Sequence, residues 1–394
     1  MPLKKYFHTE LLLKMKRSIL GISIGIVLGG VSFISNAEIT LLQQDPQPYD
    51  LLSRLTFQVG GSIRPQMNAV TGQQTYKDNV FDGGTRFRFS TDYYLFDDVS
   101  WINYYELGVN IPAVLDWNDH YAPGANNTIR RQLYTGFKSK TYGQLTFGQQ
   151  LSVYYDVIGA KTDVWDYDML AQGPGNGVNG DYDGSYRSRK QIKYKVSVGD
   201  SDLYAAALLP DDDYLTSDNF HYKRKGGGSV GINYHLTPTL SWGLAYNYTS
   251  AEVNSPVTHQ STDYNQSLTG TGFSWKPGNW MVSATGGLYQ NFLTTKIKNT
   301  NDYFAGNAYG IEYFAGYTFP INSFAVKTIK PYFMGDRLEY LDDRNYEKRD
   351  NGVGISFQLK YGFRVDYEYV VTTASATSTG QDYNTNIIRA WYDF

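Results

Sequence analysis

The sequence predicts an all-β fold, a sixteen-stranded antiparallel transmembrane β-barrel. Three observations predict it. Apolar and polar residues alternate in many short segments, long and short connections alternate between those segments, and the chain ends on an aromatic residue within an alternating segment. Alternation with period two is the pattern of a strand whose two faces meet different surroundings. Hairpins with long loops at one end and short turns at the other are typical of membrane-spanning barrels.

The first element is a secretory signal, expected over residues 1–37 with cleavage after Ala37. Basic residues end at Arg17, an apolar stretch runs from residue 19 to residue 34, and Ser35 and Ala37 are the small residues of a cleavage site. A membrane anchor is the alternative, but the apolar stretch is shorter than the ~20 residues of a spanning helix. Met15 is an alternative start to Met1, because a basic pair follows it directly.

The composition excludes several classes of protein. The formal net charge is −3, and residues 1–37 contain five basic residues and one acid, a net of +4, so the remainder carries −7. A nucleic-acid binder would normally carry a basic surplus, so no nucleic-acid partner is expected. The chain has no Cys and therefore needs no disulfide chemistry. An acidic balance suits a soluble protein or a water-filled interior.

The mature chain, residues 38–394, is expected to form one domain, because no Gly/Ser-rich linker divides it. In one segment Leu240, Trp242 and Leu244 share one face while Ser241 and Gly243 share the other. Sixteen candidate strands follow this rule. They lie near residues 53–64, 84–95, 99–109, 128–138, 142–149, 186–198, 202–209, 228–236, 239–249, 270–276, 279–289, 309–319, 330–340, 352–360, 362–372 and 384–394.

The connections between these strands form two sets. One set is short, for example residues 96–98, 199–201 and 237–238. The other set is long and polar, and it lies near residues 65–83, 110–127, 150–185, 210–227, 250–269, 290–308, 341–351 and 373–383. The two sets alternate except at the turn near 320–329. Short turns on the periplasmic side and long loops outside are expected in an outer-membrane barrel.

The polar face of several strands carries charge, which decides between a barrel and a soluble sandwich. The charged residues on this face include Arg86, Arg88, Glu106, Lys193, Arg364 and Glu368. In a sandwich this face would be the outer one. In a barrel of sixteen strands it lines the lumen, because that many strands enclose a space too wide for side chains to fill. The signal segment and the asymmetry of the loops favour the barrel, with lipid and lipopolysaccharide against its apolar face.

The last strand ends at Phe394, with Ile388, Ala390 and Tyr392 on the same apolar face. An ordinary last strand would also give this pattern. Combined with the other features, the terminal Phe is interpreted as the signal by which the barrel assembly machinery recognises its substrate.

Several segments resemble the general trimeric porins of Gram-negative outer membranes. Residues 147–156 (FGQQLSVYYD) and Asp168-Met169-Leu170 resemble the fifth strand and third loop of that family. Residues 84–91 (GTRFRFST), 131–138 (RQLYTGFK) and 187–195 (RSRKQIKYK) resemble its second, fourth and sixth strands. The resemblance implies a homotrimer whose third loop, near residues 150–185, folds into the pore and narrows it.

The resemblance also implies that arginines on the barrel wall face this loop. The arginine of the second family strand falls on Arg86, with Arg88 on the same face. That of the sixth strand falls on Arg187, and Arg189 continues its face.

Two further wall positions are implied by the resemblance. An inward acid of the third strand falls on Glu106, and the arginine of the fourth strand falls on Arg131. Alternation predicts instead that Arg131 faces outward, because Leu133 and Phe137 have the same parity as Arg131 and would prefer lipid. Arg130 is therefore an alternative for this role.

The third connection supplies the residues expected to face that wall. The first acid of the family loop falls on Asp168, while its second falls on Gln172, which removes one negative charge. Asp163 and Asp166 crowd around Trp165 and can compensate. Opposed charges across a narrow aqueous slot create a field that orients solutes and biases ion selectivity. If the loop lay outside instead, these acids would only be solvated.

The expected function is passive diffusion of ions and small hydrophilic solutes. An oligosaccharide-selective porin is the alternative, with Trp165, Tyr155 and Tyr167 as stacking faces. An enzyme is a remote alternative: His235 is expected at the periplasmic side with no acid paired to it, and the other four His lie in the signal or in outer loops. No cofactor is expected, and Asp211-Asp212-Asp213 is more simply a solvated acidic loop than a metal site.

Overall fold

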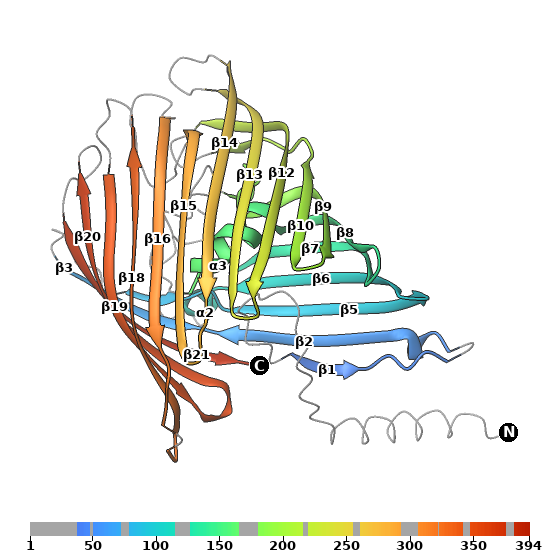
Figure 1. Ribbon diagram of the computed structural model, residues 1–394, viewed down its shortest axis with the longest axis horizontal. Coiled ribbons are helices and arrows are strands. Elements are labelled where there is room, and N and C mark those ends of the chain that lie inside the picture. Colours follow the sequence, from blue (N-terminus) through green and yellow to red (C-terminus); the bar gives the residue numbers. More distant parts are fainter. Residues whose placement is uncertain are drawn as a thin grey trace.

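The structure is a computed structural model that describes residues 38–47, 50–71, 79–114, 127–164, 180–215, 220–254, 261–292, 306–321, 323–341, 347–375 and 382–394. Within these ranges the chain forms one antiparallel sheet of 21 strand segments (Figure 1). Sixteen of the segments correspond one for one to the predicted strands, and each pairs with the next until the last meets the first. The predicted sixteen-stranded antiparallel barrel is therefore confirmed.

The sixteen strands are β2 (Leu55–Ile63), β5 (Arg86–Phe96), β6 (Val99–Val109), β7 (Thr128–Ser139), β8 (Gly143–Leu151), β9 (Arg187–Val198), β10 (Ser201–Leu208), β12 (His221–Thr237), β13 (Leu240–Asn254), β14 (Ser261–Trp275), β15 (Trp280–Phe292), β16 (Gly306–Tyr317), β18 (Val326–Tyr340), β19 (Glu347–Leu359), β20 (Phe363–Ser375) and β21 (Tyr383–Asp393). Shorter segments are β1 (Ile39–Leu42), β3 (Pro65–Thr71), β4 (Asn79–Asp82), β11 (Tyr214–Leu215) and β17 (Phe319–Pro320). The helical turns are η1 (Leu52–Arg54), α2 (Ile111–Val114), η2 (Tyr155–Gly159), α3 (Ala160–Thr162) and η4 (Lys360–Gly362). In the described ranges none of the helices has the length and apolar character needed to span a membrane.

The two faces of the wall have the inverse polarity of a soluble protein. On β13, Trp242 and Leu244 are 39% and 42% exposed, whereas Asn247 on the opposite face is fully buried. The buried polar residues of other strands include Arg88 and Glu106. Apolar side chains cover the outside and polar side chains line the inside, as in a barrel surrounded by hydrocarbon.

Several strands extend further than alternation predicted. β12 begins at His221 rather than near residue 228, and β14 begins at Ser261 rather than near residue 270. At the start of β12, Lys223 and Lys225 are exposed while Arg224 is buried, so both faces carry charge. Beyond the apolar band both faces of a strand meet water, and the alternation by which a strand is recognised disappears.

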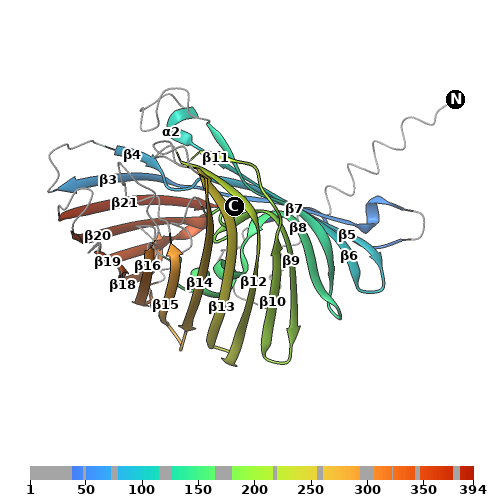
Figure 2. The same ribbon diagram turned by 90° about the horizontal axis from the view of Figure 1, so that it is seen from above.

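The ring closes where the two ends of the chain meet. Ile63 of β2 pairs with Tyr392 of β21, and β3 continues the same register along β21 (Figure 2). Gly61 and Phe394 exchange both backbone hydrogen bonds, at 2.7 and 3.1 Å. The Phe394 ring packs against Phe87 at a centroid distance of 5.8 Å.

Phe394→Ala is expected to reduce the amount of assembled barrel, because the ring seals this seam and we expect it to serve in recognition as well. Gly61→Val tests the seam alone: a Cβ at Gly61 would lie 2.6 Å from the Phe394 ring and 2.6 Å from the Arg86 carbonyl oxygen. Such contacts must displace backbone, which costs at least ~1–3 kcal/mol. The heat-modifiable fraction in outer-membrane preparations measures both effects. Wild-type levels in both variants would contradict the expectation.

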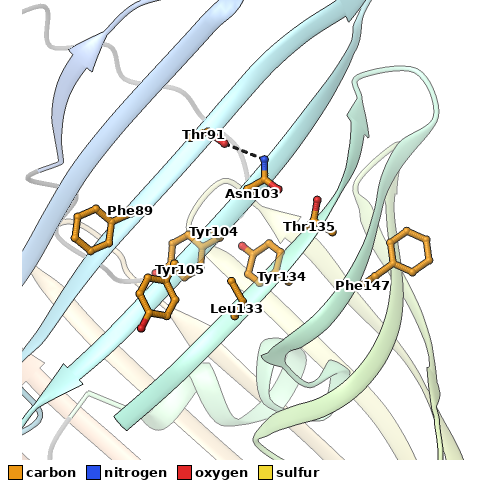
Figure 3. Close-up of a pocket in the computed structure, with 9 residues that line it drawn as sticks. All are labelled: Phe89, Thr91, Asn103, Tyr104, Tyr105, Leu133, Tyr134, Thr135 and Phe147. Atoms are coloured by element: carbon orange, nitrogen blue, oxygen red, sulfur yellow. Dashed lines mark hydrogen bonds between the residues drawn. The ribbon is translucent and has the colours of Figure 1, made fainter. Parts of the chain in front are cut away.

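The outer surface of β5 to β8 contains a pocket of about 340 Å³ (Figure 3). Phe89, Tyr105, Leu133 and Phe147 contribute apolar side chains to its lining. A polar row also contributes, formed by Thr91, Asn103 and Thr135; the Asn103 amide donates to the Thr91 hydroxyl at 3.0 Å. Polar groups that face hydrocarbon are costly unless they have partners, so this patch differs from an ordinary lipid-facing wall.

Candidate functional site

The inner wall of β5, β6 and β7 carries a buried ionic group. Glu106 is only 3% exposed, and it accepts a hydrogen bond from Arg88 Nε at 3.2 Å and one from Arg131 Nε at 2.5 Å. The Tyr104 hydroxyl donates to the same carboxylate at 3.1 Å. One carboxylate thus holds two guanidiniums by charge-assisted bonds, which leaves the group with a net positive charge.

A β-bulge explains how Arg131 reaches the lumen. Glu106 pairs with Gln132, but the next residue, Leu107, pairs with Arg130, so Arg131 is an extra residue in β7. A bulge adds one residue to one strand and shifts the alternation on one side of it. Leu133 can therefore face outward, at 45% exposure, while Arg131 binds Glu106 inside. Arg130, the alternative, donates to the Gln149 side chain at 2.9 Å.

Arg86 lies next to this group and has different partners. Its Nε donates to the carbonyl oxygen of Gly84 at 2.8 Å, and in the described part of the chain no carboxylate lies within ion-pair distance of it. Gly84 has a φ of 91°, a conformation that favours glycine. Among Arg86, Arg88 and Arg131, Arg86 is therefore the one without a direct carboxylate contact in the described residues.

The third connection, residues 152–186, begins as a helical stem, which is visible around α3 inside the barrel (Figure 1). Val153, Tyr154, Val157 and Ile158 are at most 1% exposed, and they pack in one cluster with residues of β13 to β18, such as Leu268. The spacing i, i+1, i+4, i+5 of these residues is a helical signal that alternation along β8 concealed.

Two glycines make room for this stem. A Cβ at Gly243 would lie 2.6 Å from the Val157 carbonyl oxygen, and a Cβ at Gly270 would lie 2.3 Å from the Tyr154 hydroxyl. Farther along, the Thr162 and Thr285 hydroxyls are 3.1 Å apart. The stem is thus fitted to the inner face of the wall.

Lys161 provides a second attachment of the stem to the barrel wall. Its ammonium donates to the Asn233 side chain at 2.7 Å and to the Ser241 hydroxyl at 3.2 Å. Burial lowers the pKa of Lys161 to about 8. Val164, the last described residue of this arm, packs near Phe314, Tyr332 and neighbouring residues of β16 to β20.

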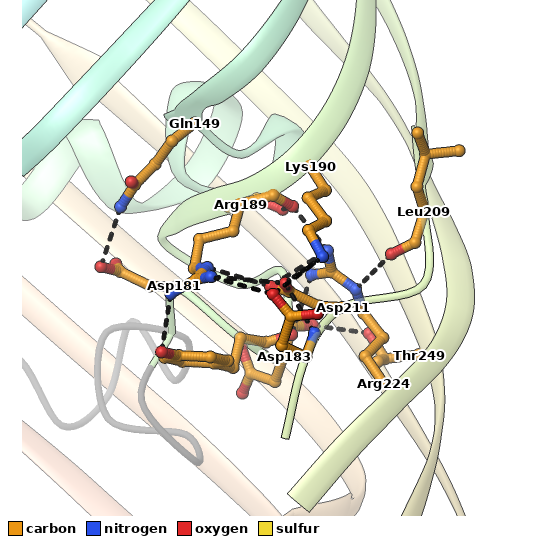
Figure 4. A network of polar contacts seen from close by, with 12 residues as sticks. Gln149, Asp181, Asp183, Arg189, Lys190, Leu209, Asp211, Arg224 and Thr249 are labelled. Carbon is orange, nitrogen blue, oxygen red and sulfur yellow. Dashed lines mark hydrogen bonds and ion pairs between the residues drawn. The ribbon is translucent and has the colours of Figure 1, made fainter. Parts of the chain in front are cut away.

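The returning arm of the connection is held by buried Arg224 of β12 (Figure 4). Arg224 donates to the carbonyl oxygens of Tyr182, Arg189 and Leu209 at 2.8, 2.5 and 2.9 Å. Asp211 accepts ion pairs from Arg189 and Lys190, each at 3.1 Å. Three segments are therefore tied to one guanidinium.

Asp183 of this arm is buried, and both its backbone carbonyl and its carboxylate accept hydrogen bonds. The Thr249 hydroxyl donates to its carbonyl oxygen at 2.6 Å, and the Ser185 amide donates to its carboxylate at 2.8 Å. Burial raises the pKa of Asp183 to about 7. Near neutral pH a substantial fraction of this carboxyl is thus uncharged, which lowers the cost of enclosing it.

The structure separates the predicted site residues into groups. Arg187 lies 3.5 Å from Asp181 of the returning arm, whereas Arg189 belongs to the network around Asp211. Asp163 accepts a hydrogen bond from the Tyr155 hydroxyl. Trp165, Asp166, Asp168 and Gln172 lie outside the described residues.

An acidic row on the inner wall is absent from the sequence prediction. Glu312 of β16 pairs in register with Asp336 of β18, and Asp336 pairs with Asp350 of β19. All three are at most 1% exposed. Like charges directly opposite each other repel. Lys348 forms an ion pair with Asp350 at 3.3 Å, so three acids face one lysine and the row has a formal net negative charge. The sequence pattern could have indicated this row, because each acid has the same parity as the inward-facing residues of its strand.

One expectation about histidine is wrong. His235 has an acid beside it, because its Nε2 lies 3.5 Å from Asp202, which extends from the neighbouring strand β10. The Ser197 hydroxyl also donates to Asp202, at 2.5 Å. Asp202 follows a short turn and is far from His235 along the chain, so the sequence did not indicate that the two lie together. The pairing of β10 with β12 brings them close.

Comparisons with known proteins agree with this architecture. Residues 25–329 match the family model described as Gram-negative porin. No curated protein sequence matches the chain. Among solved structures, OmpF of Salmonella typhi, in complex with daunomycin, has a TM-score of 0.65 at 14% identity, covering 86% of this chain and 98% of that one.

Two further structures have the same fold. The anion-selective porin of Comamonas acidovorans has a TM-score of 0.60 at 12% identity, covering 86% of this chain and 100% of that one. A trimer form of OmpT of Vibrio cholerae has a TM-score of 0.56 at 15% identity, with coverages of 86% and 99%.

A closed barrel with an inverted polarity, a charged lumen and a partly internal third connection defines the class of outer-membrane channels. The chain belongs to the Gram-negative porin family. It is therefore an outer-membrane protein of a Gram-negative bacterium.

Proposed function

We propose that this porin is a passive channel for ions and small hydrophilic solutes, narrowed by its third connection. The observation that carries the proposal is the helical stem, whose apolar residues pack on the inner face of the barrel. A segment anchored there occupies part of the lumen. Pore diameter and lining charge together set which solutes pass.

Selectivity, in this proposal, comes from opposed charges across the lumen. Arg86, Arg88, Arg131, Arg187 and Arg189, with Glu106 among them, form the wall side. Asp163, Trp165, Asp166, Asp168 and Gln172 form the loop side. The row from Glu312 to Asp350 adds negative potential on strands removed from those arginines. Low-dielectric walls focus such a field on the aqueous path.

The contacts of the two histidines in the described residues agree with transport rather than with catalysis. A hydrolase needs a nucleophile bonded to its base. Ser197 donates to Asp202 rather than to His235, and exposed His221 contacts Asp213. We therefore assign no reaction and no cofactor to this chain.

We also propose that the mature chain starts after Ala37, that Phe394 serves in recognition by the assembly machinery, and that three copies associate. The OmpT relative exists in a trimer form. Polar residues such as Asn103 on the outer wall of β5 to β7 suit a contact with protein better than one with lipid. Lipid and lipopolysaccharide would cover the remaining outer surface.

Reconstitution in planar bilayers tests the proposed function. We expect stable single-channel steps in KCl, and liposome swelling rates that fall smoothly with the size of neutral sugars. Current that saturates with one oligosaccharide would instead favour the selective alternative. Heat-denatured protein is the control. Absence of conductance from correctly folded protein would refute the channel itself.

A further inference from the structure

A second basic cluster surrounds Trp391 on the inner wall of the seam. The guanidinium carbons of Arg64 and Arg364 lie 3.6 and 3.7 Å from the centroid of the indole, and that of Arg389 lies 4.8 Å from it. Each distance is within cation–π range. The face is the inward one, because Trp391 is 9% exposed and Arg389 1% exposed.

The sheet register explains the stacking. Arg364 of β20 pairs directly with Trp391 of β21. Arg64 lies on the other side of β21, between the register pairs Ile63–Tyr392 and Gln66–Arg389. Neighbouring strands are roughly 4.8 Å apart, so the indole lies between two guanidiniums that extend from opposite sides. Stacking on the indole restricts the orientation of both guanidiniums before any ligand binds.

Two carboxylates accompany the cluster. Asp366 accepts from Arg364, with Nη2 at 2.8 Å and Nε at 3.0 Å from the same oxygen. Glu368 lies 3.5 Å from Arg389 and accepts the Tyr332 hydroxyl at 2.8 Å. The Arg364 side chain nevertheless keeps 27% exposure. Part of its guanidinium is thus accessible to a solute in the lumen.

The indole itself points to a missing acceptor. Trp391 Nε1 is buried and donates to no atom of the residues that the structure describes. A buried indole N–H normally has a hydrogen-bond partner. A donor without an acceptor, surrounded by guanidiniums, is suited to an anionic oxygen.

The cluster is continuous with the wall arginines near Glu106. A Cβ at Gly83 would lie 3.2 Å from Arg389 Cδ, and a Cβ at the adjacent Gly84 would lie 2.9 Å from Arg86 Nη2. These two glycines separate Arg389 from Arg86. The two basic groups are therefore neighbours on the wall, and the Asp82 carboxylate lies beside them, where it accepts the Gly84 amide at 3.0 Å.

We propose that the Trp391 cluster is a binding site for the oxyanion group of a small anionic solute, a carboxylate or a phosphate. Arg364 binds the oxygens through its exposed N–H groups, and Trp391 donates Nε1–H and orients the guanidiniums. Charge-assisted bonds from a planar fork match the geometry of both groups. The site rests on the proposed function, since the solute reaches it through an open lumen.

Calorimetric titration of the detergent-folded protein tests the site. Inorganic phosphate and succinate are titrated separately at about 0.01 M ionic strength, where the Debye length is roughly 30 Å. We expect saturable binding of at least one anion. Arg364→Gln and Trp391→Leu should each raise its Kd by about tenfold, which corresponds to ~1.4 kcal/mol. Trp391→Phe keeps a stacking ring without the N–H and should have an intermediate effect.

Arg349→Gln is the matched control, because Arg349 is an exposed arginine that pairs with Glu347 outside the cluster. Its Kd should equal that of the wild type. The inference is overturned if neither anion binds saturably, or if Arg364→Gln and Trp391→Leu bind as the wild type does. If Arg364→Gln fails to fold, Arg364→Lys keeps the charge, loses the fork and should still weaken binding. KCl conductance reports separately on the channel, so loss of binding with intact conductance refutes only this site.

Discussion

Replacing Arg86 by Gln is expected to raise the ratio of K⁺ to Cl⁻ permeability by roughly sixteenfold. A unit charge about 5 Å from the path of an ion contributes ~0.8 kcal/mol in a water-like medium. That energy corresponds to about a fourfold rise in the local K⁺ concentration and about a fourfold fall in that of Cl⁻, so the ratio changes roughly sixteenfold. Arg86 donates to a backbone carbonyl and makes no direct contact with a carboxylate of the described residues, so no ion pair holds its charge.

Arg88→Gln is the matched comparison. Arg88 shares Glu106 with Arg131, so its charge is partly compensated within the group. The shift in reversal potential across a tenfold KCl gradient should therefore be smaller for Arg88→Gln than for Arg86→Gln. Adding Arg187→Gln to Arg86→Gln should extend the shift. Equal reversal potentials for Arg86→Gln and the wild type, in correctly assembled barrels, would place Arg86 away from the ion path.

The salt dependence provides an internal check. The Debye length is about 10 Å at 0.1 M and about 3 Å at 1 M. The difference between Arg86→Gln and the wild type should therefore be large at low salt and nearly vanish at 1 M KCl. A difference that persists at high salt would indicate a steric change in the pore rather than a change in its field.

The number and order of the strands were predictable because one physical contrast runs along the whole chain. Leu244 lies on the exposed outer face of β13 and Asn247 on its buried inner face, and a strand alternates between the two faces at every residue. The prediction fails where that contrast ends. At the start of β12 both faces meet water, and the sequence loses the alternating pattern although the strand continues.

The candidate site was predictable only in part. Arg88 and Glu106 follow alternation, whereas Arg131 violates it, because a bulge is a property of two paired strands and not of one segment. The cluster around Trp391 depends on three segments, near residues 64, 364 and 391, that meet only when the ring closes. No local pattern in the sequence reports such a meeting.

Replacing residues 165–179 by a short Gly/Ser linker is expected to increase single-channel conductance by roughly a factor of two, since conductance follows the narrowest cross-section. The substitution removes Trp165, Asp166 and Asp168 and keeps the anchors on both sides. Lys161 and Thr162 still bind β12, β13 and β15, and the returning arm still binds Arg224. Liposome swelling should admit larger sugars than the wild type does. Removal of residues 255–260, between β13 and β14, is the control and should leave conductance unchanged.

A cysteine at position 168 tests the same segment without shortening it, because the chain has no other Cys. A small anionic thiol reagent restores the charge that Asp168→Cys removes and should restore cation preference. A bulky neutral reagent should lower conductance, because it fills space in the constriction. The two reagents distinguish the effect of the segment's charge from the effect of its volume. A deletion changes both at the same time. Complete labelling by the bulky reagent with unchanged current would place residue 168 outside the pore and assign the selectivity to the wall alone.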